Sequence, residues 1–167
     1  MKVAVNEMTG LLAFETKITR RKIITLIVYS IYLLFLGYLL FFAHDFGRIA
    51  EGRDFSFNFI PFKEILRYIL RADVLGAGPV AVNLLGNIAA FIPMGICLPL
   101  LRPGLFGHPY RVAVVGALNS AAVEFIQLVS RVGCCDVDDV ILNTFGVVLG
   151  YFLVVGFIHR KEPEDAV

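Results

Sequence analysis

The stretch SAAVEFIQLVSRVGCCDVDDVILN, residues 120–143, decides how the rest of this chain is interpreted. It places ionisable and amide side chains in an otherwise apolar sequence, although an ionisable group inside a membrane span costs about 2.5–3.5 kcal/mol on insertion scales. Four polar residues spaced i, i+4, i+7 and i+11 share one stripe of a helix: Ser120, Glu124, Gln127 and Arg131. The stretch therefore predicts a polar site inside a small bundle of membrane helices.

The composition of the whole chain is typical of a protein that folds in a bilayer. Of its 167 residues, 58% are hydrophobic and 17% are charged, and the mean hydropathy is +0.79. Soluble domains carry about a quarter charged residues, and one this short could not bury so many apolar side chains. The net charge of +1 gives no argument for nucleic acid as a partner.

Four apolar runs are long enough to cross the membrane, since about 20 helical residues span the ~30 Å hydrocarbon core. We predict transmembrane helices over residues 23–43, 80–101, 112–130 and 140–158. The first run is too long for the apolar part of a signal peptide and no small-residue cleavage site follows it, so we expect it to stay uncleaved. The predicted fold class is an all-α integral membrane bundle of four transmembrane helices.

Three regions follow from this pattern. Residues 1–22 are expected to form a tail with little structure, residues 23–158 a single membrane domain, and residues 159–167 a second, charged tail. With four spans, both termini lie on the same side as the loop of residues 102–111. That side carries nine Lys and Arg residues against six on the other, so we predict a multi-pass protein of the cell membrane with both termini cytoplasmic.

The first outer loop, residues 44–79, contains an amphipathic segment. Pro61 suits the first turn of a helix, and apolar residues then recur at helical spacing with charged residues between them. This pattern predicts a short interfacial helix in the outer headgroup region. A cap packed on the bundle explains the pattern equally well, and the sequence leaves the two open.

Glu124 is the only acidic residue within a predicted span. Such an acid is a functional candidate, as a ligand for a headgroup, a proton carrier or a general base with a raised pKa. The alternative is a structural hydrogen bond or ion pair between helices. Ser120 is the best-placed hydroxyl for nucleophilic catalysis, but no histidine lies within a span to activate it. Glu124 is therefore the best catalytic candidate, although the catalytic residues stay unknown.

Amides and acids at the ends of two other spans extend the polar set. Asn83 and Asn87 lie at i, i+4, so they share a face from which they can bridge helices for about 0.6–2 kcal/mol each. Asp136 can cap the last span, and its neighbours Asp138 and Asp139 favour the positive end of the helix dipole. Three carboxylates exceed what one cap requires. Mg²⁺ or Ca²⁺ is conceivable there, but no ligand spacing makes it specific, so we predict no metal.

The face of Asp136 and Asp139 continues through Asn143 to Gly146 and Gly150, a spacing typical of closely packed helices. We predict that one binding site is formed by the polar residues Asn83, Asn87, Ser120, Glu124, Gln127, Arg131, Asp136, Asp139 and Asn143. Arg131 would hold a phosphate or carboxylate, and the acids would hold an amine, a hydroxyl or a cation. We expect no cofactor. The cysteines Cys97, Cys134 and Cys135 show no zinc-ligand spacing.

Several motifs in this order resemble those of the VanZ-like family of small membrane proteins. They are Asn58-Phe-Ile-Pro-Phe62, the run from Asn83 to Gly95, Ser120-x-x-x-Glu124-x-x-Gln127, Arg131, Asp136-Val-Asp-Asp139 and Leu142-Asn-Thr-Phe-Gly146. The resemblance implies a bacterial cell-envelope protein. The namesake of the family is an accessory determinant of resistance to the glycopeptide teicoplanin, and other members are linked to lipoglycopeptide tolerance. The resemblance supplies no reaction.

Three classes of function remain. A binding or accessory protein needs polar groups but no reactive one, and we rank it first. An intramembrane enzyme acting on a lipid-linked envelope substrate would use Glu124 as its base, and a small transporter ranks last. The expected partners are membrane lipids and either a lipid-linked cell-wall precursor or a glycopeptide. Whether the chain forms an oligomer stays open.

Overall fold

The computed structural model describes residues 2–41, 57–130 and 134–159, with side chains from Arg20 to Ile158. It is mostly helical, and four helices are long and apolar enough to cross a membrane. These are α1 (Lys2–Phe41), α4 (Ala77–Leu101), α5 (Pro109–Ser130) and α6 (Val137–His159). The predicted all-α membrane fold is confirmed, and the described span boundaries agree with the predicted ones within three residues. The last two residues of the first predicted span lie outside the described residues.

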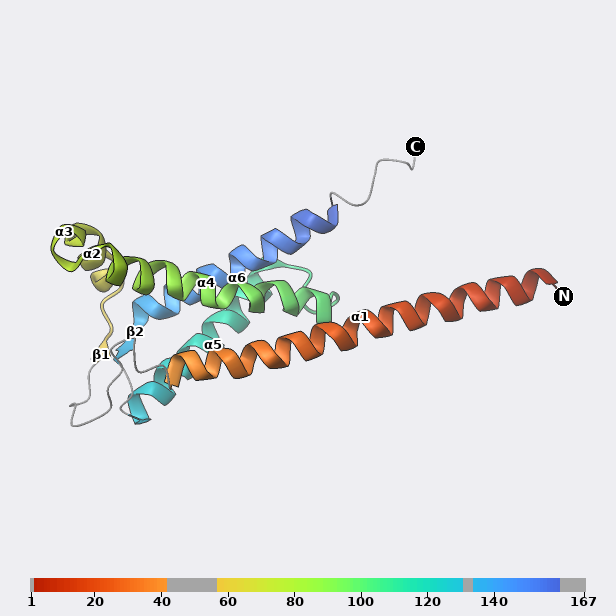
Figure 1. Ribbon diagram of the computed structural model, residues 1–167, viewed down its shortest axis with the longest axis horizontal. Helices are drawn as coiled ribbons and strands as arrows, with labels where there is room; N and C mark the ends of the chain where they lie inside the picture. Colours follow the sequence, from red (N-terminus) through yellow and green to blue (C-terminus); the bar gives the residue numbers. More distant parts are fainter. Residues whose placement is uncertain (1, 42–56, 131–133, 160–167) are drawn as a thin grey trace.

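The four long helices alternate in direction, as Figure 1 shows. As a result, α1 begins and α6 ends at one end of the bundle. Four short elements gather at the opposite end, which we call the distal end: β1 (Phe57–Asn58), α2 (Lys63–Leu70), α3 (Ala72–Leu75) and β2 (Cys135–Asp136). Segments far apart in the sequence therefore meet where α4 and α6 begin.

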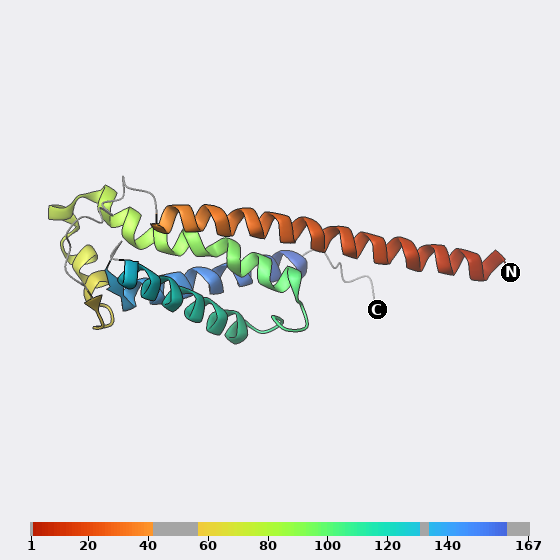
Figure 2. The ribbon, with the colours of Figure 1, turned by 90° about the horizontal axis from the view of Figure 1, so that it is seen from below.

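The helix α1 is longer than its membrane span. It begins at Lys2, so the prediction of little structure before residue 23 is wrong for residues 2–22. This segment contains no proline, and its one glycine, Gly10, costs only about 1 kcal/mol in a helix. The helix of the span therefore continues without interruption, and Figure 2 shows it extending well beyond the other helices.

Glycines allow α4 and α6 to pack backbone against backbone. A Cβ atom built on Gly146 would lie 2.1 Å from the carbonyl oxygen of Ile88, and one on Gly150 would lie 2.1 Å from that of Ile92. No side chain fits in that space. Gly146 and Gly150, whose spacing predicted close packing of the last span, thus lie at the contact of α6 with α4. Around this contact the most deeply buried apolar residues are Phe91, Met94, Val112 and Val147.

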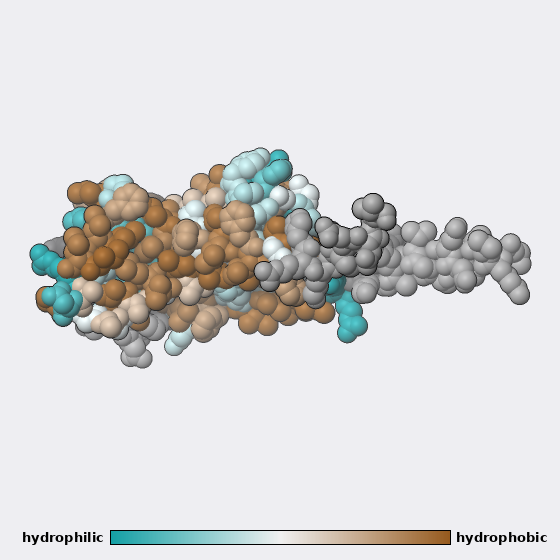
Figure 3. Space-filling view, turned by 90° about the horizontal axis from the view of Figure 1, so that it is seen from above, coloured by the Kyte–Doolittle hydropathy of each residue, from teal (hydrophilic) through white to brown (hydrophobic). Residues whose placement is uncertain are grey.

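Most of the other apolar side chains on the spans point outward. The share of a span that is buried inside the protein ranges from 11% in α1 to 33% in α6. Figure 3 shows hydrophobic residues over most of the visible length of the bundle, with hydrophilic residues nearer its ends. An exposed apolar surface of this extent is typical of helices whose solvent is hydrocarbon.

At the distal end the chain is held by a two-residue parallel pairing. Phe57 pairs with Cys135 and Asn58 pairs with Asp136, which brings β1 against the start of α6. A turn then leads into α2, so the predicted amphipathic helix exists. Pro61 lies in this turn and not in the first helical turn as we predicted. Phe62, the residue before the helix, has a left-handed backbone with φ of 65°.

Candidate functional site

The carboxylate of Asp138 joins α6 to α2. It is 1% exposed, and its Oδ1 accepts the backbone N–H of Phe62 at 2.5 Å. Its Oδ2 accepts the N–H groups of Glu64 at 2.7 Å and Ile65 at 3.1 Å. Asp138 therefore serves as the N-terminal cap of a helix to which it does not belong. Hydrogen bonds to a charged group contribute about 1.5–3 kcal/mol each, enough to offset the roughly 1–2 kcal/mol of left-handed backbone at Phe62.

Asp136 fastens β1 to the same helix start. Its Oδ1 accepts the N–H of Asp138 and the side-chain amide of Asn58, both at 2.9 Å. Asp136 thus caps α6, as predicted. Asn58 is buried and in turn accepts the N–H of Ile60 at 3.3 Å. Burial raises the pKa of the Asp136 carboxyl, while the hydrogen bonds from Asp138 and Asn58 act in the opposite direction.

The stripe predicted on α5 faces the interior, and its described members reach three different neighbours. Glu124 is 3% exposed, and its Oε2 accepts the N–H of Asp136 on β2 at 2.9 Å. Gln127 donates to the carbonyl oxygen of Leu40 at the end of α1, at 2.9 Å. Ser120 accepts a hydrogen bond from Asn143 on α6 at 2.8 Å. Arg131, the fourth member of the stripe, lies outside the described residues.

These contacts fix the positions of α1, α5 and α6 relative to one another. Each is made by a buried side chain, so the groups are withdrawn from any ligand at the surface. Asn143 keeps one buried atom, Oδ1, that makes no hydrogen bond within the described part of the chain. The three described members of the stripe therefore pack and form hydrogen bonds inside the bundle.

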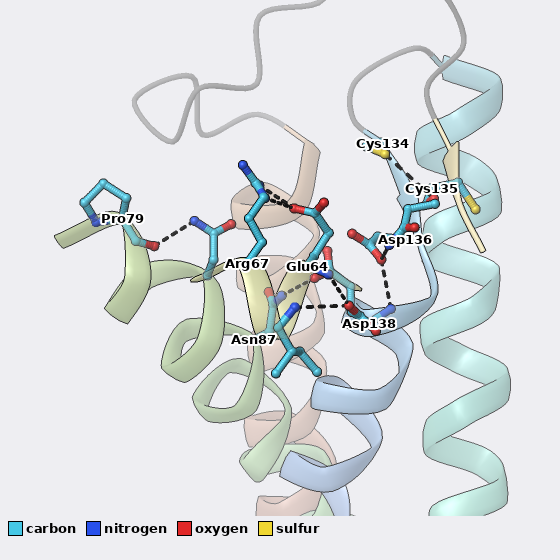
Figure 4. A network of polar contacts seen from close by, with 12 residues as sticks. Glu64, Arg67, Pro79, Asn87, Cys134, Cys135, Asp136 and Asp138 are labelled. Atoms are coloured by element: carbon cyan, nitrogen blue, oxygen red, sulfur yellow. Dashed lines mark hydrogen bonds and ion pairs between the residues drawn. The ribbon is translucent and has the colours of Figure 1, made fainter. Parts of the chain in front are cut away.

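The two asparagines of α4 differ in their partners. Asn87 donates to Oδ1 of Asp139 on α6 at 2.5 Å and so bridges the helices, as predicted. Asn83 instead donates to the carbonyl oxygen of Pro79, one turn back in its own helix, at 2.8 Å. Figure 4 shows Asn87 beside Asp138 and Glu64, with Pro79 set apart. Asn83 is therefore near the network without being bonded to it in the described structure.

Three residues of α2 complete the polar surface beside Asn87 and Asp139. Arg67 donates from Nε to Oε2 of Glu64 at 2.6 Å and forms an ion pair with the same oxygen through Nη2. Its guanidinium lies over the ring of Tyr68, 4.8 Å from the centroid. Burial raises the pKa of the Tyr68 hydroxyl; Arg67 opposes this rise, and the negative charges of Glu64 and Asp139 add to it. Tyr68 is thus electrostatically coupled to α6.

We call this set the α2–α4–α6 cluster; its members are Glu64, Arg67, Tyr68, Asn87 and Asp139. All five side chains are partly or fully accessible, unlike those of Ser120, Glu124 and Gln127. The cluster presents a cation, two carboxylates, a phenol and an amide at the distal end of the bundle. Such a set can bind a ligand that carries an anionic group next to an amine or hydroxyl.

Sequence reasoning missed part of this arrangement. Asn58, Glu64, Arg67 and Tyr68 lie in the loop that we treated as an amphipathic helix, and Asp138 was assigned only to the dipole of its own helix. One signal was available: Asn58 belongs to the first motif of the family resemblance. The three carboxylates near the start of α6 belong to the hydrogen-bond network, and the described residues contain no group of three or more His, Cys, Asp or Glu side chains that could hold a metal ion.

Comparison with known proteins identifies a family. The family model described as VanZ/LLP1 matches residues 29–159, most of the chain and all residues of the network and the cluster. No curated protein and no solved structure matches the chain.

Proposed function

Because this chain belongs to the VanZ/LLP1 family, we propose that it has a binding or accessory role at the bacterial cell envelope, with the α2–α4–α6 cluster as its ligand site. The observation that carries the proposal is the position of Arg67, Tyr68 and Asp139. They are accessible polar groups held at the distal end of an otherwise apolar bundle, where an envelope component would meet them. The buried residues Glu124 and Asp138 and the half-buried Asp136 hold the elements that present this cluster.

The chemistry of the cluster favours a ligand with charges of both signs. Arg67 is the group suited to a phosphate or carboxylate, since a guanidinium can donate two parallel hydrogen bonds to either. Asp139 and Glu64 are suited to an amine or to hydroxyls. Lipid headgroups, the peptide part of a lipid-linked cell-wall precursor and glycopeptides all carry such groups, and we propose glycopeptide tolerance as the cellular outcome.

The proposal places both termini in the cytoplasm and the distal end at the outer leaflet. Native Cys134 tests this, because it is an exposed cysteine at the distal end, whereas Cys97 is buried. Burial also raises the pKa of the Cys135 thiol, which lowers its reactivity. We expect a membrane-impermeant maleimide to label intact cells expressing the protein, and the label to disappear in Cys134→Ser. Labelling only after the membrane is permeabilised would reverse the orientation.

Replacing Arg67 by glutamine tests the ligand site. The change removes the charge from an exposed side chain, and loss of a charged hydrogen bond of about 1.5–3 kcal/mol lowers ligand affinity roughly tenfold or more. In a teicoplanin-susceptible bacterium, we expect the wild-type protein to raise the inhibitory concentration of teicoplanin and Arg67→Gln to return it toward the level of the empty vector. Membrane abundance is measured in parallel by immunoblot.

Arg102→Gln is the matched control, because Arg102 is an exposed arginine at the opposite end of the bundle. It should retain the wild-type effect. Full tolerance in Arg67→Gln at equal abundance would contradict the site. A wild-type protein without effect on teicoplanin would contradict glycopeptide tolerance. A changed headgroup or precursor in the lipid profile of expressing cells would instead favour the intramembrane enzyme.

A further inference from the structure

The helix α2 has three distinct sides. Its half-buried residues Glu64, Ile65 and Tyr68 face the bundle, and α2 contacts both α4 and α6. None of its residues is buried. Leu66, Ile69 and Leu70 point away from the bundle, with Leu70 75% exposed. The apolar side of this helix is therefore not its contact with the protein.

The turn before α2 extends the apolar side. Phe59, Ile60 and Phe62 are all more than half exposed, and the ring of Phe59 stacks on that of Phe57 with centroids 5.4 Å apart. We call the exposed apolar residues of the turn and of α2 the distal apolar surface: Phe59, Ile60, Phe62, Leu66, Ile69 and Leu70. Such a surface requires a covering partner.

A row of cations borders this surface. Lys63, Arg67 and Arg71 follow one another at i, i+4 and i+8, so they line one edge of the helix beside Leu66 and Leu70. An apolar face next to a cationic edge is typical of helices that lie in a membrane interface, with the cations on anionic headgroups.

The position of α2 in the fold points to the same partner. The spans of α4 and α6 begin at Ala77 and Val137, next to the distal elements, so α2 lies at the level where the hydrocarbon ends. On the first turns of α4, Val82 and Leu85 are also exposed. The exposed apolar side chains of α2 are thus followed along the chain by exposed apolar side chains at the start of a span.

We propose that α2 is an interfacial membrane anchor that binds anionic phospholipid. Its apolar side chains lie among the acyl chains of the adjacent leaflet, and Lys63 and Arg71 contact lipid phosphates. The inference does not rest on the proposed ligand site, because the lipid contacts are assigned to Lys63, Arg71 and the apolar side chains, none of which belongs to the α2–α4–α6 cluster. The helix therefore keeps the cluster at a constant depth in the membrane.

The chain contains no tryptophan, so one introduced tryptophan reports on its own surroundings. Leu70→Trp replaces an exposed side chain, and Gly104→Trp serves as the reference, because Gly104 is exposed in the loop after α4 and a Cβ there meets no atom within 4 Å. Both full-length variants are reconstituted into vesicles of phosphatidylcholine alone or mixed with phosphatidylglycerol, with brominated acyl chains as quenchers. Thermal unfolding confirms that each variant is folded.

We expect Leu70→Trp to emit at shorter wavelength than Gly104→Trp and to lose most of its fluorescence to the brominated lipid. Quenching should be stronger with brominated phosphatidylglycerol than with brominated phosphatidylcholine, and this preference should disappear when Lys63 and Arg71 are replaced by glutamine. Quenching by aqueous acrylamide in place of lipid would overturn the proposal. Protection from both quenchers would overturn it too, because a protein would then cover the surface.

Discussion

Replacing Gly95 by alanine is expected to destabilise the bundle more than any other change of one methyl group. A Cβ at this position would lie 1.9 Å from the carbonyl oxygen of Val147 and 2.9 Å from the backbone nitrogen of Tyr151. Both atoms belong to the backbone of α6, so no side-chain rotation can relieve the overlap and the two helices must separate. We expect a loss of about 3 kcal/mol, the upper part of the usual range for overpacked cores, measured by unfolding in detergent.

Gly86→Ala is the matched control in the same helix. A Cβ on Gly86 meets no atom within 4 Å, and alanine is about 1 kcal/mol more favourable than glycine in a helix. The control should therefore be as stable as the wild type or slightly more stable. Equal unfolding of the two variants would show that α4 and α6 do not pack as closely as described.

Replacing Asp138 by alanine is the second change with a large expected effect. Three backbone N–H groups, those of Phe62, Glu64 and Ile65, would lose their buried acceptor. We expect a loss of about 2–4 kcal/mol, since each bond to a carboxylate contributes about 1.5–3 kcal/mol and part is recovered when the released amides meet water. A lower midpoint of thermal unfolding and a lower membrane abundance are the measurable results.

Asp73→Ala controls for the loss of a carboxylate at the same end, because Asp73 is exposed on α3. It should unfold like the wild type. The unfolding temperature of Asp138→Asn should lie between those of Asp138→Ala and the wild type. Asparagine keeps one acceptor oxygen but turns an amide donor toward the backbone donors. If Asp138→Ala unfolded at the wild-type temperature, the carboxylate would not be holding α2.

Hydropathy was sufficient to predict the four spans, because the length of each apolar run matches the membrane thickness. Few structures other than a transmembrane helix are open to such a segment. The inward direction of the stripe on α5 also followed from spacing alone: Ser120, Glu124 and Gln127 are all buried. Their partners did not. Leu40, Asp136 and Asn143 lie on three other elements, and only the packed bundle brings each within reach of its hydrogen bond.

The role of Asp138 could not be predicted for a similar reason. In the sequence it is an acid in the first turn of a helix, which the helix dipole already explains. Its acceptor role depends on a turn more than seventy positions earlier that places Phe62, Glu64 and Ile65 against it. The amphipathic segment combines the two alternatives that the sequence left open. Its polar side contacts the bundle, as a cap does, while its apolar side faces outward, as in an interfacial helix.

The central claim is that Asp138 of α6, together with Asp136 just before this helix, holds α2 on the distal end and thereby forms the α2–α4–α6 cluster. Hydrogen exchange in lipid nanodiscs, comparing the wild type, Asp138→Ala and Asp73→Ala, tests it most directly. We predict slow exchange for the amides of Phe62, Glu64 and Ile65 in the wild type and in Asp73→Ala. In Asp138→Ala they should exchange fast while amides within α4 and α6 stay protected. Fast exchange of these three amides in the wild type, or equal protection in Asp138→Ala, would contradict the account.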